Sequence, residues 1–239
     1  TLTPIRKTPN AAQPSPDLLR CLRSLSNDPR NLVYIVSGRS QLSLERWLGQ
    51  VQGLGLSAEH GSFLKPIDQL SEASSMGWLQ LVHEQGWQQQ VLPILEHYTE
   101  RTPGSFIEQK VASLCWHYRL ADPDFGARQA ANAQAHLSNL VANLGAGVEI
   151  ISGKRNLEIR SLQANKGTIV RQLLERHAAV DFVLCLGDDR TDEDMFRQLL
   201  DHPHAFCCVV GSGTTKTLAQ WHLNTPEQVL SLLLRLAQL

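Results

Sequence analysis

The chain has 239 residues, 42% of them hydrophobic, so it is long enough to bury one large core or two small ones. Its formal net charge of −1 excludes a broad basic surface for nucleic acid or acidic lipid. The five cysteines are odd in number and lack CxxC spacing, which predicts free thiols in a reducing, cytoplasmic compartment. No apolar run approaches the ~20 residues that span a bilayer, so no membrane partner is expected.

Short apolar runs, each followed by a polar loop that contains glycine, alternate with helical segments in both end regions of the chain. Continuous apolar runs of this length are typical of parallel strands covered on both faces. The sequence therefore predicts an α/β protein with a Rossmann-like parallel-sheet core, and ligands bind at the carboxyl ends of such strands. The predicted core strands are residues 32–36, 54–58, 182–186 and 205–210.

The middle of the chain follows a different pattern, which predicts an inserted antiparallel α+β cap domain at 87–164. The core domain would then comprise 1–86 and 165–239. Such an insert can close over the strand ends as a lid. Its expected elements are a helix at 87–100 broken or started near Pro93, a long strand or hairpin strand at 105–119, a helix at 127–144, and strands at 148–152 and 156–161.

An acidic loop follows the third predicted core strand, with five carboxylates between Asp188 and Asp194. Carboxylates this close repel one another unless a cation lies among them, and hard oxygen ligands suit Mg²⁺. Asp192, Glu193 and Asp194 are also explained by the preference of a first helical turn for acids. Asp188 and Asp189 directly follow the strand and are not easily explained that way, so they predict a metal site.

Two further polar segments have both a functional and an ordinary explanation. Ser37 follows the first predicted strand, where it can hold a phosphate oxygen or cap the next helix. Lys166 precedes a helix expected at 168–176, where its charge opposes the helix dipole. It either binds an anion or is an ordinary solvent lysine. The histidines nearest to these segments, His60, His117 and His222, belong to no HxH or HxxxH pair, which argues against a zinc site.

The predicted cap has a candidate sugar-binding face. Glu108 and Lys110 are two residues apart on a strand and share one face, which the even-numbered residues from Ala112 to Tyr118 would also join. On the strand at 156–161, Leu157 and Ile159 point one way, and Asn156, Glu158 and Arg160 point the other. A face with carboxylates, a lysine and nearby aromatic rings suits sugar hydroxyls, and a plain solvated face fits these residues equally well.

Taken together, Ser37, Lys166 and Gly187-Asp188-Asp189 resemble the second, third and fourth motifs of the haloacid-dehalogenase-like phosphatases. The finer resemblance is to the trehalose-6-phosphate phosphatases, most of all to the fungal phosphatase domain, and it covers nearly the whole chain. It rests on Val36-Ser37-Gly38-Arg39, Ser57-Ala58-Glu59-His60-Gly61, Tyr98-Thr99-Glu100-Arg101-Thr102, Gly104 to Lys110, Trp116-His117-Tyr118-Arg119 and Gly187 to Phe196.

This resemblance implies Mg²⁺-dependent hydrolysis of trehalose 6-phosphate to trehalose and phosphate. In the family an aspartate attacks phosphorus and forms an aspartyl-phosphate, and a second aspartate two residues later acts as general acid and base. The resemblance gives Ser37, Lys166 and Asp189 catalytic roles and makes Asp188 the metal ligand. The substrate-binding residues that it implies are Arg39, His60, Gly61, Glu108, Lys110, Arg119 and Glu158.

One departure concerns the first motif, Asp-x-Asp-Gly-Thr-Leu-Thr, of which only the tail matches, at Thr1-Leu2-Thr3. The nucleophile, the general acid/base and a first core strand are therefore expected upstream of residue 1, and without them the sheet would have an apolar gap. The main alternative is an inactive, regulatory phosphatase-like domain that partners the subunits of a trehalose-synthase complex. A second alternative is a phosphatase of the same fold that acts on another sugar phosphate.

Overall fold

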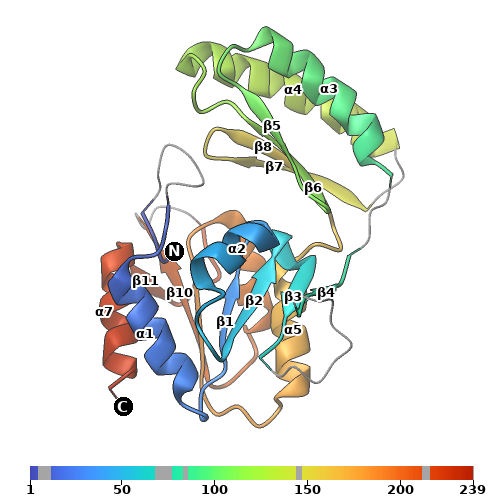
Figure 1. The fold of residues 1–239 in the computed structure, drawn as a ribbon. Helices are drawn as coiled ribbons and strands as arrows, with labels where there is room; N and C mark the ends of the chain where they lie inside the picture. Colours follow the sequence, from blue (N-terminus) through green and yellow to red (C-terminus); the bar gives the residue numbers. More distant parts are fainter. Residues whose placement is uncertain (5–11, 68–76, 83–85, 144–146, 212–215, 239) are drawn as a thin grey trace. The chain divides into compact units, whose positions relative to one another are not determined.

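The computed structural model describes residues 1–4, 12–67, 77–82, 86–143, 147–211 and 216–238 (Figure 1). It divides into two compact units: residues 1–81 with 165–239, and residues 82–164. The inserted unit thus starts five residues before the expected position 87 and ends at the expected 164. No helix in the described ranges is both long enough and apolar enough to cross a membrane.

The first unit has an α/β fold with two small sheets. In one sheet, β1 (Val33–Val36) and β2 (Leu54–Ala58) are parallel, and β3 (Phe63–Lys65) and β4 (Leu79–Gln80) extend it antiparallel. In the other sheet, β9 (Val183–Gly187), β10 (Ala205–Val210) and β11 (Trp221–Leu223) are parallel. The expected strands are therefore found, although β1 starts one residue later than expected and β9 is shifted by one residue.

The strands β1 and β9 are both edges of their sheets. All four residues of β1 are only partly buried, although Val33 and Ile35 reach the same hydrophobic cluster as Leu184 and Leu186 of β9. Parallel strands are normally covered on both sides, so two parallel edges that share a core are unusual. The two sheets thus share a hydrophobic cluster without being joined by strand pairing.

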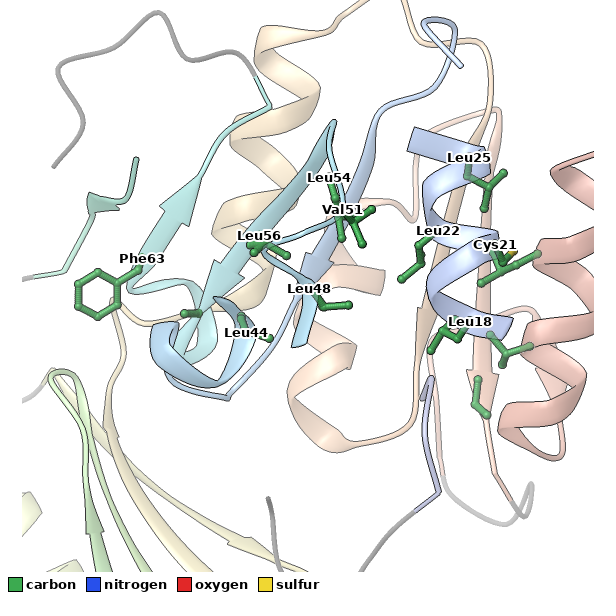
Figure 2. Close-up of a cluster of buried hydrophobic side chains, with 14 of the residues drawn as sticks. Leu18, Cys21, Leu22, Leu25, Leu44, Leu48, Val51, Leu54, Leu56 and Phe63 are labelled. Atoms are coloured by element: carbon green, nitrogen blue, oxygen red, sulfur yellow. The ribbon is translucent and has the colours of Figure 1, made fainter. Parts of the chain in front are cut away.

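Helices cover the sheets of this unit. Five of them are α1 (Pro16–Asn27), α2 (Gln41–Leu48), α5 (Lys166–Arg176), α6 (Glu193–Gln198) and α7 (Pro226–Leu236). Leucines of α1 and α2 pack with residues of β2 in the main core, as Figure 2 shows. Ser15 caps α1 and Pro16 occupies its first turn, where proline is tolerated because no intrahelical N–H bond is lost.

The second unit is an antiparallel sheet with two helices on one face (Figure 1). The strand order is β5-β6-β8-β7, from β5 (Phe106–Gln109), β6 (Ser113–His117), β8 (Asn156–Ser161) and β7 (Val148–Gly153). The helices are α3 (Gln88–Arg101) and α4 (Pro123–Asn143). Pro93 lies inside α3, so the expectation that it breaks or starts a helix was wrong. Leu157 and Ile159 of β8, which were predicted to share one face, both lie in the core of this unit.

Candidate functional site

The acidic loop is built around Asp192, at the carboxyl end of β9. One of its carboxylate oxygens, Oδ2, accepts the backbone N–H groups of Asp188 (2.7 Å) and Asp189 (3.0 Å). Asp189 in turn accepts from the backbone N–H (2.8 Å) and hydroxyl (2.6 Å) of Thr191 and so caps the short turn Arg190–Asp192. Asp192 thus fixes the backbone that presents Asp188 and Asp189 at the strand end.

Lys166 is the first residue of α5, only 5% exposed. Its Nζ donates to Oδ1 of Asp192 at 2.7 Å and lies 4.0 Å from Oδ1 of Asp189. Burial favours the neutral amine, but the three nearby carboxylates outweigh it, so the pKa of Lys166 is raised and the group is an ammonium. The ordinary solvent lysine is therefore excluded, and the helix begins two residues before the expected Thr168.

Sequence reasoning missed the part played by Asp192. It explained this residue by the charge preference of a helix N-terminus, whereas the residue is 3% exposed and its carboxylate is hydrogen-bonded through both oxygens. The available signal was the separation of four residues from Asp188, which lets a side chain reach back to an N–H at the start of its own turn. Asp189, which the sequence analysis did not explain as a cap, does cap the turn at Arg190–Asp192.

Ser37 lies in the loop after β1, which interlocks with the loop after β2. The backbone N–H of His60 donates to the Ser37 carbonyl (3.0 Å), and that of Glu59 donates to the Arg39 carbonyl (2.9 Å). Ser40, rather than Ser37, caps α2. The helix-cap explanation of Ser37 is thereby excluded, and its hydroxyl stands at the strand end, accepting from the Arg39 backbone N–H (3.2 Å).

Gly61 brings this pair of loops against the start of α5. Its φ of +101° favours glycine, and a Cβ there would lie 2.7 Å from the carbonyl oxygen of Asn165. Asn165 caps α5 directly before Lys166. Burial raises the pKa of Asp189, but Lys166, the Thr191 hydrogen bonds and the charge of His60 outweigh it and lower the pKa. The loop that carries Ser37 therefore contacts the loop after β2, which packs against the start of α5 next to Lys166.

Asp188 presents its carboxylate at the end of β9. The Thr1 hydroxyl donates to its Oδ1 at 2.5 Å. The carboxylate is 28% exposed. A partly exposed carboxylate oxygen at the end of a parallel strand has the chemistry of a Mg²⁺ ligand, so the residues fit the expected ion.

Arg39, predicted to bind substrate, has its guanidinium 4.5 Å from the centre of the Trp47 ring. This stacking holds the side chain on α2. Stacking uses the face of a guanidinium whereas anions bind at its edge, so this contact does not exclude an anion.

The second unit has a separate polar cluster on the sheet face opposite its helices. Glu108 of β5, Cys115 of β6 and Glu158 of β8 form one row across three strands. Lys110 Nζ lies 3.5 Å from Glu158 Oε1, which also accepts from the Ser113 hydroxyl (3.0 Å). Both side chains of the Lys110–Glu158 pair are about nine-tenths buried.

His117 completes this cluster. Its Nε2 lies 2.9 Å from Glu108 Oε2, and this hydrogen bond lowers the pKa of Glu108 despite partial burial. Burial, aided by the charge of Glu158, raises the pKa of the Cys115 thiol to about 12. Arg119, also predicted to bind substrate, donates to the Lys154 carbonyl (2.9 Å) at the turn between β7 and β8.

The expected partners on this face were partly wrong. A continuous strand would place Glu108 with Leu114 and Trp116, but the chain turns after Lys110, and the N–H of Lys110 donates to the Ser113 carbonyl. The turn changes the register, so Glu108 faces Cys115 while Leu114 and Trp116 lie in the core under the helices. Alternation along β8 placed Glu158 correctly because that strand is uninterrupted.

The fold of the chain is that of the haloacid dehalogenase-like hydrolases. A protein of that description from Bacteroides thetaiotaomicron covers 94% of this chain and 93% of its own, with a TM-score of 0.63 and 14% identity. The sequence resemblance to this class rests on Ser37, Lys166 and the paired Asp188 and Asp189, which lie at these strand and helix ends.

Within this class, the chain belongs to the trehalose-phosphatase family, whose model matches residues 1–227. A Schizosaccharomyces pombe trehalose-phosphatase is 43% identical over 247 residues, which cover 99% of this chain and 29% of the relative. The solved C-terminal domain of Candida albicans trehalose-6-phosphate phosphatase covers all of this chain and 89% of its own, with 44% identity and a TM-score of 0.90. The chain thus spans less than a third of the curated relative.

Proposed function

We propose that the protein hydrolyses trehalose 6-phosphate to trehalose and phosphate, with Mg²⁺ and through an aspartyl-phosphate. The observation that carries the proposal is the buried Lys166–Asp192 pair beside Asp188 and Asp189 at the end of β9. A buried ion pair is weak evidence of a purely structural role, because hydrophobic residues of similar volume often stabilise a protein equally well or better. Family membership gives the arrangement its substrate class.

In this proposal Lys166 and Ser37 hold phosphate oxygens. The ammonium of Lys166 neutralises charge on the phosphoryl group, which is the main contribution a protein makes to phosphoryl transfer. The Ser37 hydroxyl donates from the end of β1. His60 and Gly61 support the same anion from the loop packed on α5, and Arg39 adds a guanidinium at the edge.

Asp188 and Asp189 would hold Mg²⁺, Asp188 directly and Asp189 directly or through water. The ion supplies neutralisation of charge between the attacking carboxylate and the phosphate. Asp192 does not bind the ion in this scheme, because both of its oxygens are already bonded. The family resemblance assigns the nucleophile and the general acid/base to the aspartates of the first motif.

Glu108, Lys110 and Glu158 would bind the hydroxyls of the disaccharide. The carboxylates accept hydrogen bonds and the ammonium donates them, and the partly buried setting strengthens each one. Arg119, with its anchor at Lys154, would extend this polar face. Sugar recognition by the inserted unit thus separates choice of substrate from the chemistry of phosphate release.

Phosphate release from trehalose 6-phosphate by the intact protein, with and without EDTA, tests the proposal. We expect turnover that EDTA abolishes and that added Mg²⁺ restores. No release at saturating Mg²⁺ by a folded protein would overturn the enzyme proposal in favour of the regulatory domain. Release from other sugar phosphates but not from trehalose 6-phosphate would favour the phosphatase with a different substrate.

We extend the proposal to a cytoplasmic enzyme that works beside the subunits of a trehalose-synthase complex. All five cysteines are free and buried, which suits a reducing compartment. The Schizosaccharomyces pombe relative is more than three times as long as the region that matches this chain, so that relative has room for further domains.

A further inference from the structure

The polar face of the β5–β8 sheet brings together three side chains of different chemistry: Glu108, Cys115 and His117. A carboxylate oxygen, the thiol sulfur and an imidazole nitrogen all lie within 4.8 Å of one another. The register accounts for this grouping. Glu108 lies directly opposite Cys115 across the hairpin, and His117 is two residues further along the same strand and hence on the same face.

This donor set differs from that of the acidic loop. Thiolate and imidazole are the ligands that bind zinc and other borderline-soft ions, whereas Mg²⁺ prefers oxygen ligands alone. Zinc bond lengths place neighbouring donor atoms roughly 3.3–3.6 Å apart, so an ion requires shifts of about an ångström or less from the present positions. We propose that Glu108, Cys115 and His117 form a binding site for Zn²⁺ or a similar transition-metal ion.

The surroundings of the site balance its charge. With the thiol proton released to solvent as the sulfur–metal bond forms, one thiolate and one carboxylate neutralise a divalent ion. The nearby Lys110 would repel the ion, but its ammonium is paired with Glu158 at 3.5 Å. Asn156 donates to the Cys115 sulfur at 3.2 Å, which orients the ligand. The Glu108 side chain is 37% exposed and gives a route of entry.

Three protein ligands leave a fourth tetrahedral position for water or for an oxygen of a bound molecule. An ion bound to Glu108 would prevent this carboxylate from accepting hydrogen bonds from the disaccharide. This consequence rests on the proposed function: Zn²⁺ and the disaccharide should exclude each other, so Zn²⁺ should lower turnover of trehalose 6-phosphate while sparing a small aryl phosphate. The site itself does not depend on that function.

The spacing of the histidines did not indicate this site, because the two ligands of β6 are a cysteine and a histidine in Cys-x-His order rather than two histidines. The third ligand comes from the neighbouring strand, and the turn after Lys110 sets its register. Pairing across that turn could not be inferred from the spacing of histidines.

Titration of the intact, reduced protein with Co²⁺ in excess Mg²⁺ tests the site. Co²⁺ coordinated by thiolate absorbs by charge transfer in the near ultraviolet, and an all-oxygen site does not. We expect this band to saturate near one equivalent, to be lost in Cys115→Ser, and to need at least about tenfold more Co²⁺ in His117→Gln. Cys21→Ser, which removes another buried thiol, should leave the band unchanged.

The site is overturned if folded wild-type protein shows no band at saturating Co²⁺, or if the band survives in Cys115→Ser. Circular dichroism of both variants establishes that they are folded, and His117→Gln gives a second test if the serine variant is not. Added trehalose should reduce the band. A band that trehalose leaves intact, in protein that hydrolyses trehalose 6-phosphate normally, contradicts only the mutual exclusion.

Discussion

At the scale of single residues, Lys166 is the side chain on which the core site most depends. It is the cation that Asp192 binds and that Asp189 faces, and burial makes each of these interactions stronger than it would be at the surface. An ion pair of this kind is a weak argument for stability by itself. Its position at the end of parallel strands is what gives it functional meaning.

Lys166→Met should lower turnover of trehalose 6-phosphate by at least ~100-fold, because the phosphate loses its buried cation. It should also lower the free energy of unfolding by about 3–5 kcal/mol, since Asp192 would remain buried without its partner. Kinetics and urea denaturation measure the two effects. The control, Lys154→Met, changes an exposed lysine and should alter neither. Turnover in Lys166→Met within a few-fold of wild type would contradict the role.

Acid should destabilise the protein through Asp189 and Glu108, whose folded pKa values are both lowered. A lowered folded pKa adds stability that is complete above the unfolded pKa, near 4, and is lost as pH falls through the folded value. The urea concentration at the unfolding midpoint should therefore decrease as the pH is lowered from about 5 to about 2. In His117→Gln the pKa of Glu108 should rise toward its ordinary value, as carbon-13 NMR of the carboxyl group can measure. An unchanged pKa would show that His117 does not set it.

At the scale of elements, the site depends on close approach between loops that are distant in sequence. Gly61 allows the loop after β2 to lie against the first turn of α5. The sequence indicated each loop as a place for function, but it could not show that they touch. Contact between them is a property of how α5 packs, and no local pattern records it.

Gly61→Ala should destabilise the protein by roughly 2–4 kcal/mol, from the strained φ and from overlap with the Asn165 carbonyl. Turnover should fall too, because His60 and the start of α5 would separate. The matched control is Gly77→Ala, where φ is +77° but the nearest atom lies 3.7 Å away. We expect it to cost only the backbone strain, about 1–2 kcal/mol. Equal losses in the two variants would show that the close approach is unimportant.

The elements also show why sequence reasoning succeeded where it did. Strands such as 54–58 and 156–161 were predicted with their bounds because an uninterrupted apolar run or alternation reports burial directly. The hairpin at 105–119 was misjudged because its turn has no glycine or proline to mark it. Pro93 was misjudged because a helix can keep a proline when packing of its neighbours outweighs the lost hydrogen bond.

Ser37, Lys166 and Asp188 were predicted from their places at strand and helix ends. The structure joins Lys166 to the Asp188 backbone through Asp192, and the loop of Ser37 reaches the start of α5 through residues 59–61. Asp192 was missed because its function lies in two backbone hydrogen bonds and an ion pair across 26 residues, which spacing alone does not reveal.

At the scale of the whole molecule, each unit has its own hydrophobic core and its own polar cluster. The proposal gives them different tasks: the first unit handles phosphate and Mg²⁺, and the inserted unit recognises the sugar. Such a division predicts that changes in the inserted unit affect choice of substrate without affecting the chemistry.

The most direct test is the ratio of kcat/KM for trehalose 6-phosphate to that for a small aryl phosphate, measured in wild-type protein and in Glu108→Ala and Lys110→Ala. We expect each variant to lose at least ~100-fold for trehalose 6-phosphate, because a site built to hydrogen-bond hydroxyls is left unpaired, and to keep slow hydrolysis of the aryl phosphate. If turnover of trehalose 6-phosphate is unchanged in both variants, or if both substrates fall together in folded protein, the division of tasks is wrong.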